Sequence, residues 1–313
     1  GNINLYAGDT ITQGAVDITA AGSGNILLSA STDYNNGTPA NGNAAGAISI
    51  TDGQTISSTS GDITLRAGGD VPLSILNTSG NVTVTADYDG IGTGLSNDTG
   101  AITDGLTAET ANIVASTLTM DAAEGVGSAD QIDTTVATLD LDNTTSGNVA
   151  VTNTQALTIN QVDQDGTGMV DIVTAAGDLT IATAESGVTA TSGTVTLNAA
   201  AALAINQVIT TVGGTVDLDA GTNITSDANG DITTTAAVNT GTASGGVTVN
   251  AAGTGTIALV GDIITTGSNN NAGTGNTGGT VSVDTVDGTI GVAGITTSGG
   301  AATAGDNNGG AAG

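Results

Sequence analysis

Two acidic turns carry the residues of this chain that are best suited to binding a metal ion. Asp87-Tyr88-Asp89-Gly90 and Asp163-Gln164-Asp165-Gly166 each place carboxylates at alternate positions before a glycine. Hard cations such as Ca²⁺ take about six to eight oxygen ligands, and an Asp-x-Asp-Gly turn supplies several of them. Neither turn has the distal Glu of an EF-hand loop. We therefore name Asp87, Asp89, Asp163 and Asp165 as candidate Ca²⁺ ligands, and solvated surface carboxylates are the competing interpretation.

Two further acidic pairs have a simpler explanation. Asp140 and Asp142 alternate with leucine, and so do Asp217 and Asp219. Successive side chains of a β-strand point to opposite faces, so this alternation is typical of a strand with one buried and one solvated face. We interpret these four carboxylates as the outward side of two strands.

The composition argues against catalysis. The chain has no His and no Cys, so it offers neither an imidazole base nor a thiol nucleophile. Paired carboxylates would suit glycoside hydrolysis, but the only aromatic residues are Tyr6, Tyr34 and Tyr88. We expect a protein that is not an enzyme. A carbohydrate-active β-helix enzyme or a phage-type tailspike is the alternative, and a cleft lined by several carboxylates and Tyr would favour it.

The net charge of −29 limits the partners of this chain. Such a chain repels the phosphates of nucleic acids and anionic lipid surfaces, so we expect binding to neither. No run of apolar residues is long enough to cross a bilayer as a helix, so we expect no membrane insertion. Arg66 is the single cation, and we expect it to pair with Asp62 or Asp70. No cofactor is required by these patterns, and Ca²⁺ is the one ion that the carboxylates would suit.

A short phrase recurs along the chain and must position these residues. It reads Gly, a small polar residue, then apolar-x-apolar, as in Gly24-Asn25-Ile26-Leu27-Leu28, Gly61-Asp62-Ile63-Thr64-Leu65 and Gly80-Asn81-Val82-Thr83-Val84. A second phrase, Ala-Gly-x-x-apolar, follows some copies directly, as at Ala67-Gly68-Gly69-Asp70-Val71. Each pair of phrases predicts a strand, a glycine corner and another strand.

The spacing of the copies predicts the architecture. Most intervals are about 15 to 23 residues, and Leu157–Val162 returns as Leu203–Val208, 46 positions later. One coil cannot bury its apolar face alone, whereas stacked coils bury it and pair every strand in parallel with its neighbours. The sequence therefore predicts an all-β fold, a parallel β-helix or β-solenoid with coils of roughly 15–23 residues.

The organisation expected from this pattern is a single continuous β-solenoid over residues 1–313. Irregular segments at 31–46, 267–279 and 298–313 are expected to be loop insertions. The last of these reads like a loop whose following strand is missing, so we expect the native polypeptide to continue past Gly313 and to be a segment of a longer polypeptide.

The phrases at Gly61–Asp70 and Gly80–Ala86 resemble the repeats of filamentous haemagglutinin-like proteins and giant bacterial surface adhesins. The resemblance covers most of the chain, although 100–145 is degenerate, and it carries over no functional residue. It implies a right-handed parallel β-helix that is secreted, lies extracellularly at the bacterial cell surface and serves in adhesion or as a fibre.

The function we expect is therefore the structural shaft of an extracellular bacterial adhesin or cell-surface filament. Its expected partners are neighbouring copies or segments of the same polypeptide, in head-to-tail or lateral contact, together with host or surface glycans. A calcium-dependent surface-layer or matrix protein is a further alternative, since cations could bridge the many carboxylates.

Overall fold

A computed structural model describes residues 1–30, 46–88, 99–183, 186–238, 240, 242–270, 273–302 and 309–313. The contacts divide the chain into two compact units, Gly1–Gln155 and Ala156–Gly313, and each is described by itself. Every regular element in the described ranges is a β-strand, as the sequence predicts. The prediction of one continuous solenoid over 1–313 stays a prediction.

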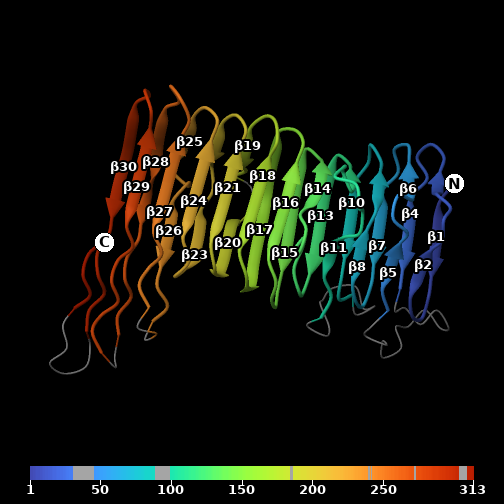
Figure 1. The fold of residues 1–313 in the computed structure, drawn as a ribbon, viewed down its shortest axis with the longest axis horizontal. Coiled ribbons are helices and arrows are strands. Elements are labelled where there is room, and N and C mark those ends of the chain that lie inside the picture. The colour runs from blue at the N-terminus through green and yellow to red at the C-terminus, as the bar shows by residue number, and fades with distance from the viewer. Residues whose placement is uncertain are drawn as a thin grey trace. The chain divides into compact units, whose positions relative to one another are not determined.

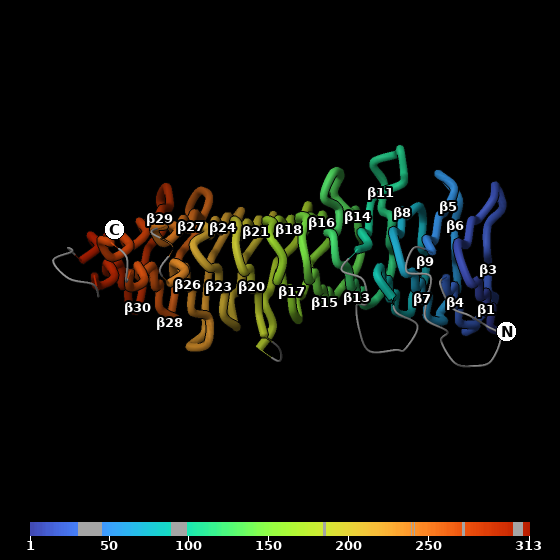
Figure 2. The backbone as a smooth tube through the Cα atoms, turned by 90° about the horizontal axis from the view of Figure 1, so that it is seen from below, coloured from blue at the N-terminus to red at the C-terminus, as the bar shows by residue number. Residues whose placement is uncertain are grey.

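The first unit stacks its strands in parallel, one coil beside the next (Figure 1). One sheet has the order β1-β4-β7-β10-β13-β15, and a second has the order β3-β6-β9-β12-β14-β16. Figure 2 shows β13 and β15 on one side of the coils and β14 and β16 on the other. Short pairs, β2 with β5 and β8 with β11, lie between them in sequence. The strands are β1 (Ile3–Tyr6), β2 (Ile11–Gln13), β3 (Ile18–Ala20), β4 (Ile26–Ser29), β5 (Ile48–Ile50), β6 (Thr55–Ser58), β7 (Ile63–Arg66), β8 (Val71–Leu73), β9 (Ile75–Asn77), β10 (Val82–Thr85), β11 (Ile102–Asp104), β12 (Ile113–Val114), β13 (Thr117–Ala122), β14 (Ile132–Thr135), β15 (Thr138–Asn143) and β16 (Val149–Asn153).

The second unit follows the same plan. Strands β18, β21, β24, β27 and β29 pair successively in parallel. Strands β17, β19, β22, β25 and β28 pair in that order, β20, β23 and β26 pair in a second row between β17 and β28, and β30 pairs with β28. Figure 2 shows β17, β20, β23, β26, β28 and β30 on the side of the coils opposite β18, β21, β24, β27 and β29. The strands are β17 (Leu157–Thr167), β18 (Val170–Thr174), β19 (Leu179–Ile181), β20 (Gly187–Ser192), β21 (Val195–Ala199), β22 (Leu203–Ile205), β23 (Ile209–Val212), β24 (Val216–Ala220), β25 (Ile224–Ser226), β26 (Ile232–Thr235), β27 (Val247–Ala251), β28 (Ile257–Ile264), β29 (Val281–Thr285) and β30 (Ile290–Thr296).

The parallel register puts like residues above one another in a thin aliphatic core. Ile26 pairs with Ile63, Ile63 with Val82, and Val82 with Leu118, and all four side chains are fully buried or nearly so. Aliphatic side chains of similar size fill such a narrow space without aromatic rings. The fold is therefore the parallel β-helix that the alternation of Ile, Val and Leu predicts.

Coil length varies with inserted segments. Ile63 and Val82 are 19 positions apart, and Leu157 and Leu179 are 22 apart, within the predicted range of roughly 15–23. Ile26 and Ile63 are 37 apart, because the segment at 31–46, of which 31–45 lies outside the described residues, falls inside that coil. The register of the core is kept across the insertion, so extra residues are accommodated between strands.

The glycine of the repeated phrase is needed because neighbouring coils approach closely there. A Cβ added to Gly61 would lie 2.2 Å from the carbonyl oxygen of Gly24, and one added to Gly214 would lie 1.6 Å from that of Gly193. Only a residue without a side chain fits at these positions. The stacked glycines, which we call the glycine column, bring the coils together at the corner.

The small polar residue after each glycine joins one coil to the next. The Asn2 Oδ1 accepts a hydrogen bond from the backbone N–H of Asn25 at 3.0 Å, and the Asn25 Oδ1 accepts one from Asp62 at 3.0 Å. The Asp62 Oδ1 in turn accepts one from Asn81 at 2.9 Å. Asn and Asp share this carbonyl-type acceptor, so either residue serves in what we call the Asx ladder.

The described residues of 267–279 and 298–313 contain no regular strand but still stack on one another. The N–H of Gly267 donates to the Ser298 carbonyl at 2.8 Å, and that of Gly300 donates to the Asn276 carbonyl at 2.8 Å. A Cβ on Gly300 would lie 2.0 Å from the Ser268 carbonyl oxygen. These glycine-rich segments therefore make contacts of the same kind as the coils.

Candidate functional site

Asp163 and Asp165 lie at alternate positions on the outward face of β17. Asp163 is partly buried and Asp165 is exposed. The Asp163 Oδ1 is buried and has no hydrogen-bond partner among the described residues. Burial, and then the negative charge of Asp165, raise the pKa of the Asp163 carboxyl above its ordinary value. A cation or a proton between these two groups would relieve both effects.

Asp87 occupies a different setting, in the first unit. Its side chain is fully buried and its φ of 70° lies in the left-handed region, which a non-glycine residue adopts only when its surroundings impose it. Gly100 packs against it, since a Cβ there would lie 2.7 Å from the Asp87 nitrogen. Asp89 lies outside the described residues. Asp87 therefore lies in a tight, buried turn, and the position of Asp89, the other candidate ligand of this turn, is not described.

The described ranges contain no group of three or more Asp or Glu side chains arranged to hold a metal ion. Asp163 and Asp165 are the one candidate pair whose placement on a shared face is described. The Ca²⁺ site stays a prediction that depends on this pair.

The pairs Asp140/Asp142 and Asp217/Asp219 point outward from their strands, as predicted. Asp217 stacks between Thr196 and Thr248, so a neutral hydroxyl separates it from acids on more distant coils. Asp219 stacks beside Asn250, whose Nδ2 donates to its Oδ1 at 3.0 Å. Burial, and then the charge of Asp219, raise the pKa of Asp217.

In the first unit two acids stack directly. Asp121 of β13 is the register partner of Asp142 of β15. Burial raises the pKa of Asp121, the hydrogen bond from the Thr85 hydroxyl at 3.3 Å lowers it, and the charge of Asp140 raises it further. The net direction is upward, so desolvation and like charge prevail over the hydrogen bond.

The expectation that Arg66 pairs with Asp62 or Asp70 is wrong within the described residues. The guanidinium carbon of Arg66 lies 5.2 Å from the ring centroid of Tyr88, a cation–π contact. Asp62 and Asp70 instead accept hydrogen bonds from backbone N–H groups of the next coil. Asp62 accepts one from Asn81 at 2.9 Å, and Asp70 accepts one from Ala101 at 3.0 Å. The carboxylates beside strand starts therefore act as acceptors between coils.

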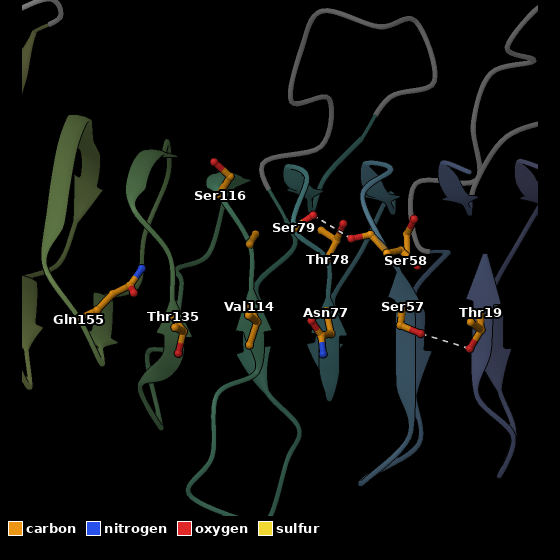
Figure 3. A pocket seen from close by; sticks show the side chains of 12 residues that line it. Thr19, Ser57, Ser58, Asn77, Thr78, Ser79, Val114, Ser116, Thr135 and Gln155 are labelled. Carbon is orange, nitrogen blue, oxygen red and sulfur yellow. Dashed lines mark hydrogen bonds between the residues drawn. The ribbon is translucent and has the colours of Figure 1, made fainter. Parts of the chain in front are cut away.

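A groove lined by small polar residues lies on the first unit. Its volume is about 630 Å³, and it crosses the strands of the sheet β3-β6-β9-β12-β14 near their C-terminal ends (Figure 3). Register partners on successive coils form one side of it. They are Thr19, Ser57, Asn77, Val114 and Thr135, with Gln155 beyond them. The turns that follow these strands form the other side with Ser58, Thr59, Thr78, Ser79, Ala115 and Ser116. We call it the Thr19–Gln155 groove.

Two buried hydroxyls fix the walls of the groove. The Ser58 Oγ donates to the Gly24 carbonyl at 2.7 Å and accepts from the Gly61 N–H at 3.0 Å. The Thr78 Oγ1 donates to the Gly61 carbonyl at 2.6 Å and accepts from the Gly80 N–H at 2.9 Å. Both groups satisfy the backbone of the glycine column and are not available to a ligand.

Four of the other polar side chains of the groove are open. The side chains of Asn77, Thr59, Ser116 and Gln155 are exposed and have no hydrogen-bond partner among the described residues. The hydroxyls of Thr19 and Ser57 bond each other at 3.2 Å, that of Ser79 donates to the Thr59 carbonyl at 2.8 Å, and that of Thr135 bonds the Thr154 hydroxyl at 2.6 Å. The lining contains no carboxylate, no cation and no tyrosine. The arrangement of carboxylates and Tyr that would favour the glycosidase alternative is therefore not found in this groove.

Sequence reasoning did not find this groove. Its register row joins residues 38, 20, 37 and 21 positions apart, so no fixed period aligns them. The usable signal is the register of the buried neighbours, such as Ile56 above Leu76 and Leu76 above Ile113. Aligning these apolar residues first would have placed Ser57, Asn77 and Val114 in one outward row.

Comparisons with protein-family models, with curated proteins and with solved structures find no match to this chain. A search of the described residues also finds no helix that is long and apolar enough to span a bilayer. Function must therefore be inferred from the fold and from the surfaces above.

Proposed function

We propose that this chain is a structural segment of a shaft, belonging to an extracellular bacterial adhesin or a cell-surface filament, with no catalytic role. The observation that carries the proposal is the repetition of one set of inter-coil contacts. The glycine column, the Asx ladder and the aliphatic core recur from coil to coil within a unit. Repetition of this kind suits a protein that must extend and bear load.

The contacts supply stiffness in a defined way. Inter-coil hydrogen bonds such as Ile26 N–H to the Asp62 carbonyl, 2.9 Å, and Ile63 N–H to the Asn81 carbonyl, 2.9 Å, run along the stacking direction. The Asx ladder adds a side-chain hydrogen bond beside them at the steps from Asn25 to Asp62 and from Asp62 to Asn81. A pull along the stack loads these bonds, and the close glycine contacts resist compression.

The surface charge fits a location outside the cell. A chain of net charge −29 stays soluble and repels nucleic acid, and its partners in this role are neighbouring copies or segments of the same polypeptide. Contacts between coil ends use unpaired strand edges, as parallel pairing does within each unit.

Electron microscopy and fibre diffraction of the purified chain test the shaft role. We expect elongated particles and, in oriented samples, a strong layer line at about 4.8 Å along the long axis. Compact round particles without that layer line would overturn the proposal.

Single-molecule stretching gives a second test. Peeling one compact coil, such as the 22 positions from Leu157 to Leu179, releases roughly 75 Å of extended chain. We expect a series of small, similar extension steps. One large cooperative rupture of each unit would contradict a shaft that yields coil by coil.

A further inference from the structure

The Thr19–Gln155 groove has the chemistry of a ligand site that the shaft role does not require. Its outward row is Thr19, Ser57, Asn77, Val114 and Thr135, one residue from each successive coil. Neighbouring coils are about 4.8 Å apart, so the row presents a side chain at a regular interval along the groove. Figure 3 shows these side chains in line.

The polar groups of the groove are both donors and acceptors. The Asn77 and Gln155 amides offer both functions, as do the hydroxyls of Thr59 and Ser116, and none of the four has a partner among the described residues. A ligand that fits must therefore carry many groups that donate and accept at short intervals. Sugar hydroxyls do so.

The centre of the groove is apolar. Val114 is partly exposed there and Ala115 lies beside it. A small aliphatic patch between hydroxyls and amides suits the C–H face of a sugar ring, although it offers less contact than an aromatic platform does. We expect each sugar ring to bind weakly and the contributions of several rings along the row to combine into a higher affinity.

Other classes of ligand fit less well. The strands below the groove, β6, β9, β12 and β14, are paired on both edges, so a peptide finds no free edge for strand addition. The lining has no Lys or Arg, and Arg66, the single cation of the chain, lies on β7 of the opposite sheet. Sulfated, phosphorylated or uronic chains would meet a net charge of −29 without a counter-charge.

We propose that the Thr19–Gln155 groove binds a neutral glycan chain laid across the coils. This role goes beyond the shaft, and a shaft of the same construction would function without it. The side chains that contact the glycan are the Asn77 amide and the Ser116 hydroxyl on either side of Val114, with Thr59 and Gln155 further along.

Saturation-transfer NMR on the intact chain tests the site with two sets of probes. The neutral set is cellohexaose, mannohexaose and xylohexaose, and the anionic set is a heparin hexasaccharide and oligogalacturonate. We expect transfer to at least one neutral oligosaccharide and to neither anionic one. Binding to no neutral probe, or to anionic probes alone, would overturn the proposal.

Two variants locate the binding. Asn77→Ala combined with Ser116→Ala removes open polar groups from the groove, and each lost hydrogen bond should weaken binding about five-fold. We expect the double variant to bind at least about ten-fold more weakly. Asn4→Ala is the matched control, because Asn4 is an exposed outward amide on β1 of the opposite sheet. Equal affinity in the double variant and in the wild type would place the glycan elsewhere.

Two further measurements distinguish failure of the groove proposal from failure of the shaft proposal. Circular dichroism verifies that the double variant keeps its strand content, as expected for exposed side chains. The particle shape under the electron microscope is measured on the same preparation. An elongated particle that binds no neutral glycan contradicts the groove proposal alone, and a round particle that binds contradicts the shaft alone.

Discussion

Replacing Gly61 by alanine tests whether the glycine column sets the distance between coils. The new Cβ would lie 2.2 Å from the oxygen and 2.5 Å from the carbon of the Gly24 carbonyl. Real contacts of this kind stay beyond 3.0 Å, so the coils must separate locally by about 0.8 Å. Gly61 is not in the left-handed region, so the cost arises from the contact and not from the backbone dihedrals.

The cost follows from the hydrogen bonds beside the contact. The Ile26 N–H to Asp62 carbonyl bond is 2.9 Å long and the Asp62 N–H to Asn25 Oδ1 bond is 3.0 Å long. A separation of about 0.8 Å lengthens both to about 3.7–3.8 Å, beyond hydrogen-bond distance. At about 1 kcal/mol each, with added packing strain, the free energy of unfolding should fall by about 2–3 kcal/mol. The melting temperature should then fall by roughly 4–12 °C.

Urea and thermal denaturation followed by far-UV circular dichroism measure this change. Gly14→Ala is the matched control, because a Cβ at Gly14 has no neighbour within 4 Å and Gly14 is not in the left-handed region. Its stability should be unchanged or higher by less than about 1 kcal/mol. Amide exchange at Ile26 localises the effect. If Gly61→Ala unfolds within about 0.5 kcal/mol of the wild type, close approach does not explain the glycine.

Three further predictions concern charge and burial. Burial raises the pKa of Asp121 and Asp217, so between the ordinary value of 3.8 and the raised one the folded state holds protons more tightly. The free energy of unfolding should therefore rise as the pH falls through the raised pKa values towards 3.8, measured by urea midpoints across pH. Asp163→Asn should raise the melting temperature at pH 7 in chelator, because it removes a partly buried charge beside Asp165. Added Ca²⁺ should stabilise the wild type more than that variant if the pair binds the ion. Thr78→Ala should lower the free energy of unfolding by about 1–3 kcal/mol, because it leaves the Gly61 carbonyl and the Gly80 N–H without this hydrogen-bond partner. Denaturation in urea measures the change.

Each of these predictions has a contrary outcome. The pH argument reverses for Asp52, whose pKa is lowered by hydrogen bonds from the side chain and backbone of Thr107, so its contribution is lost as the pH falls through that lowered value. A urea midpoint that does not rise as the pH falls through the raised pKa values towards 3.8 would contradict the prediction for Asp121 and Asp217. Equal responses of wild type and Asp163→Asn to Ca²⁺ would remove this pair as a site. Ser57→Ala is the control for Thr78→Ala, because Ser57 is only partly buried and its hydroxyl bonds the Thr19 hydroxyl and, among the described residues, no backbone group. Equal losses would remove the special role of the buried hydroxyl.

The parallel β-helix could be predicted because its signals are local. Alternation such as Ile63-Thr64-Leu65 marks one buried face, and Gly61 before it marks the corner, so each coil carries its own evidence. The reason for the small polar residue was not predictable in the same way. Asn25 and Asp62 differ in charge, and only their stacking on adjacent coils reveals the shared acceptor.

The groove and the contact of Arg66 depend on distances in sequence that vary. Asn77 and Val114 are 37 positions apart, and the register that makes them neighbours is set by buried residues on other positions. Arg66 meets Tyr88 across a coil of 19 residues, whereas the nearer Asp62 and Asp70 are already engaged. Proximity along the chain was therefore a poor guide to proximity in space.

The Asx ladder also gives each stack a direction. In the steps from Asn2 to Asn81 the side-chain oxygen belongs to the earlier coil and the N–H to the later one. The same order holds for Asp178 with Ala202 and for Asn223 with Thr256. A coil that has already formed thus holds its acceptors ready for the coil that follows it. A polypeptide that emerges with its N-terminus first can therefore fold onto its own completed part, each turn serving as the template for the next.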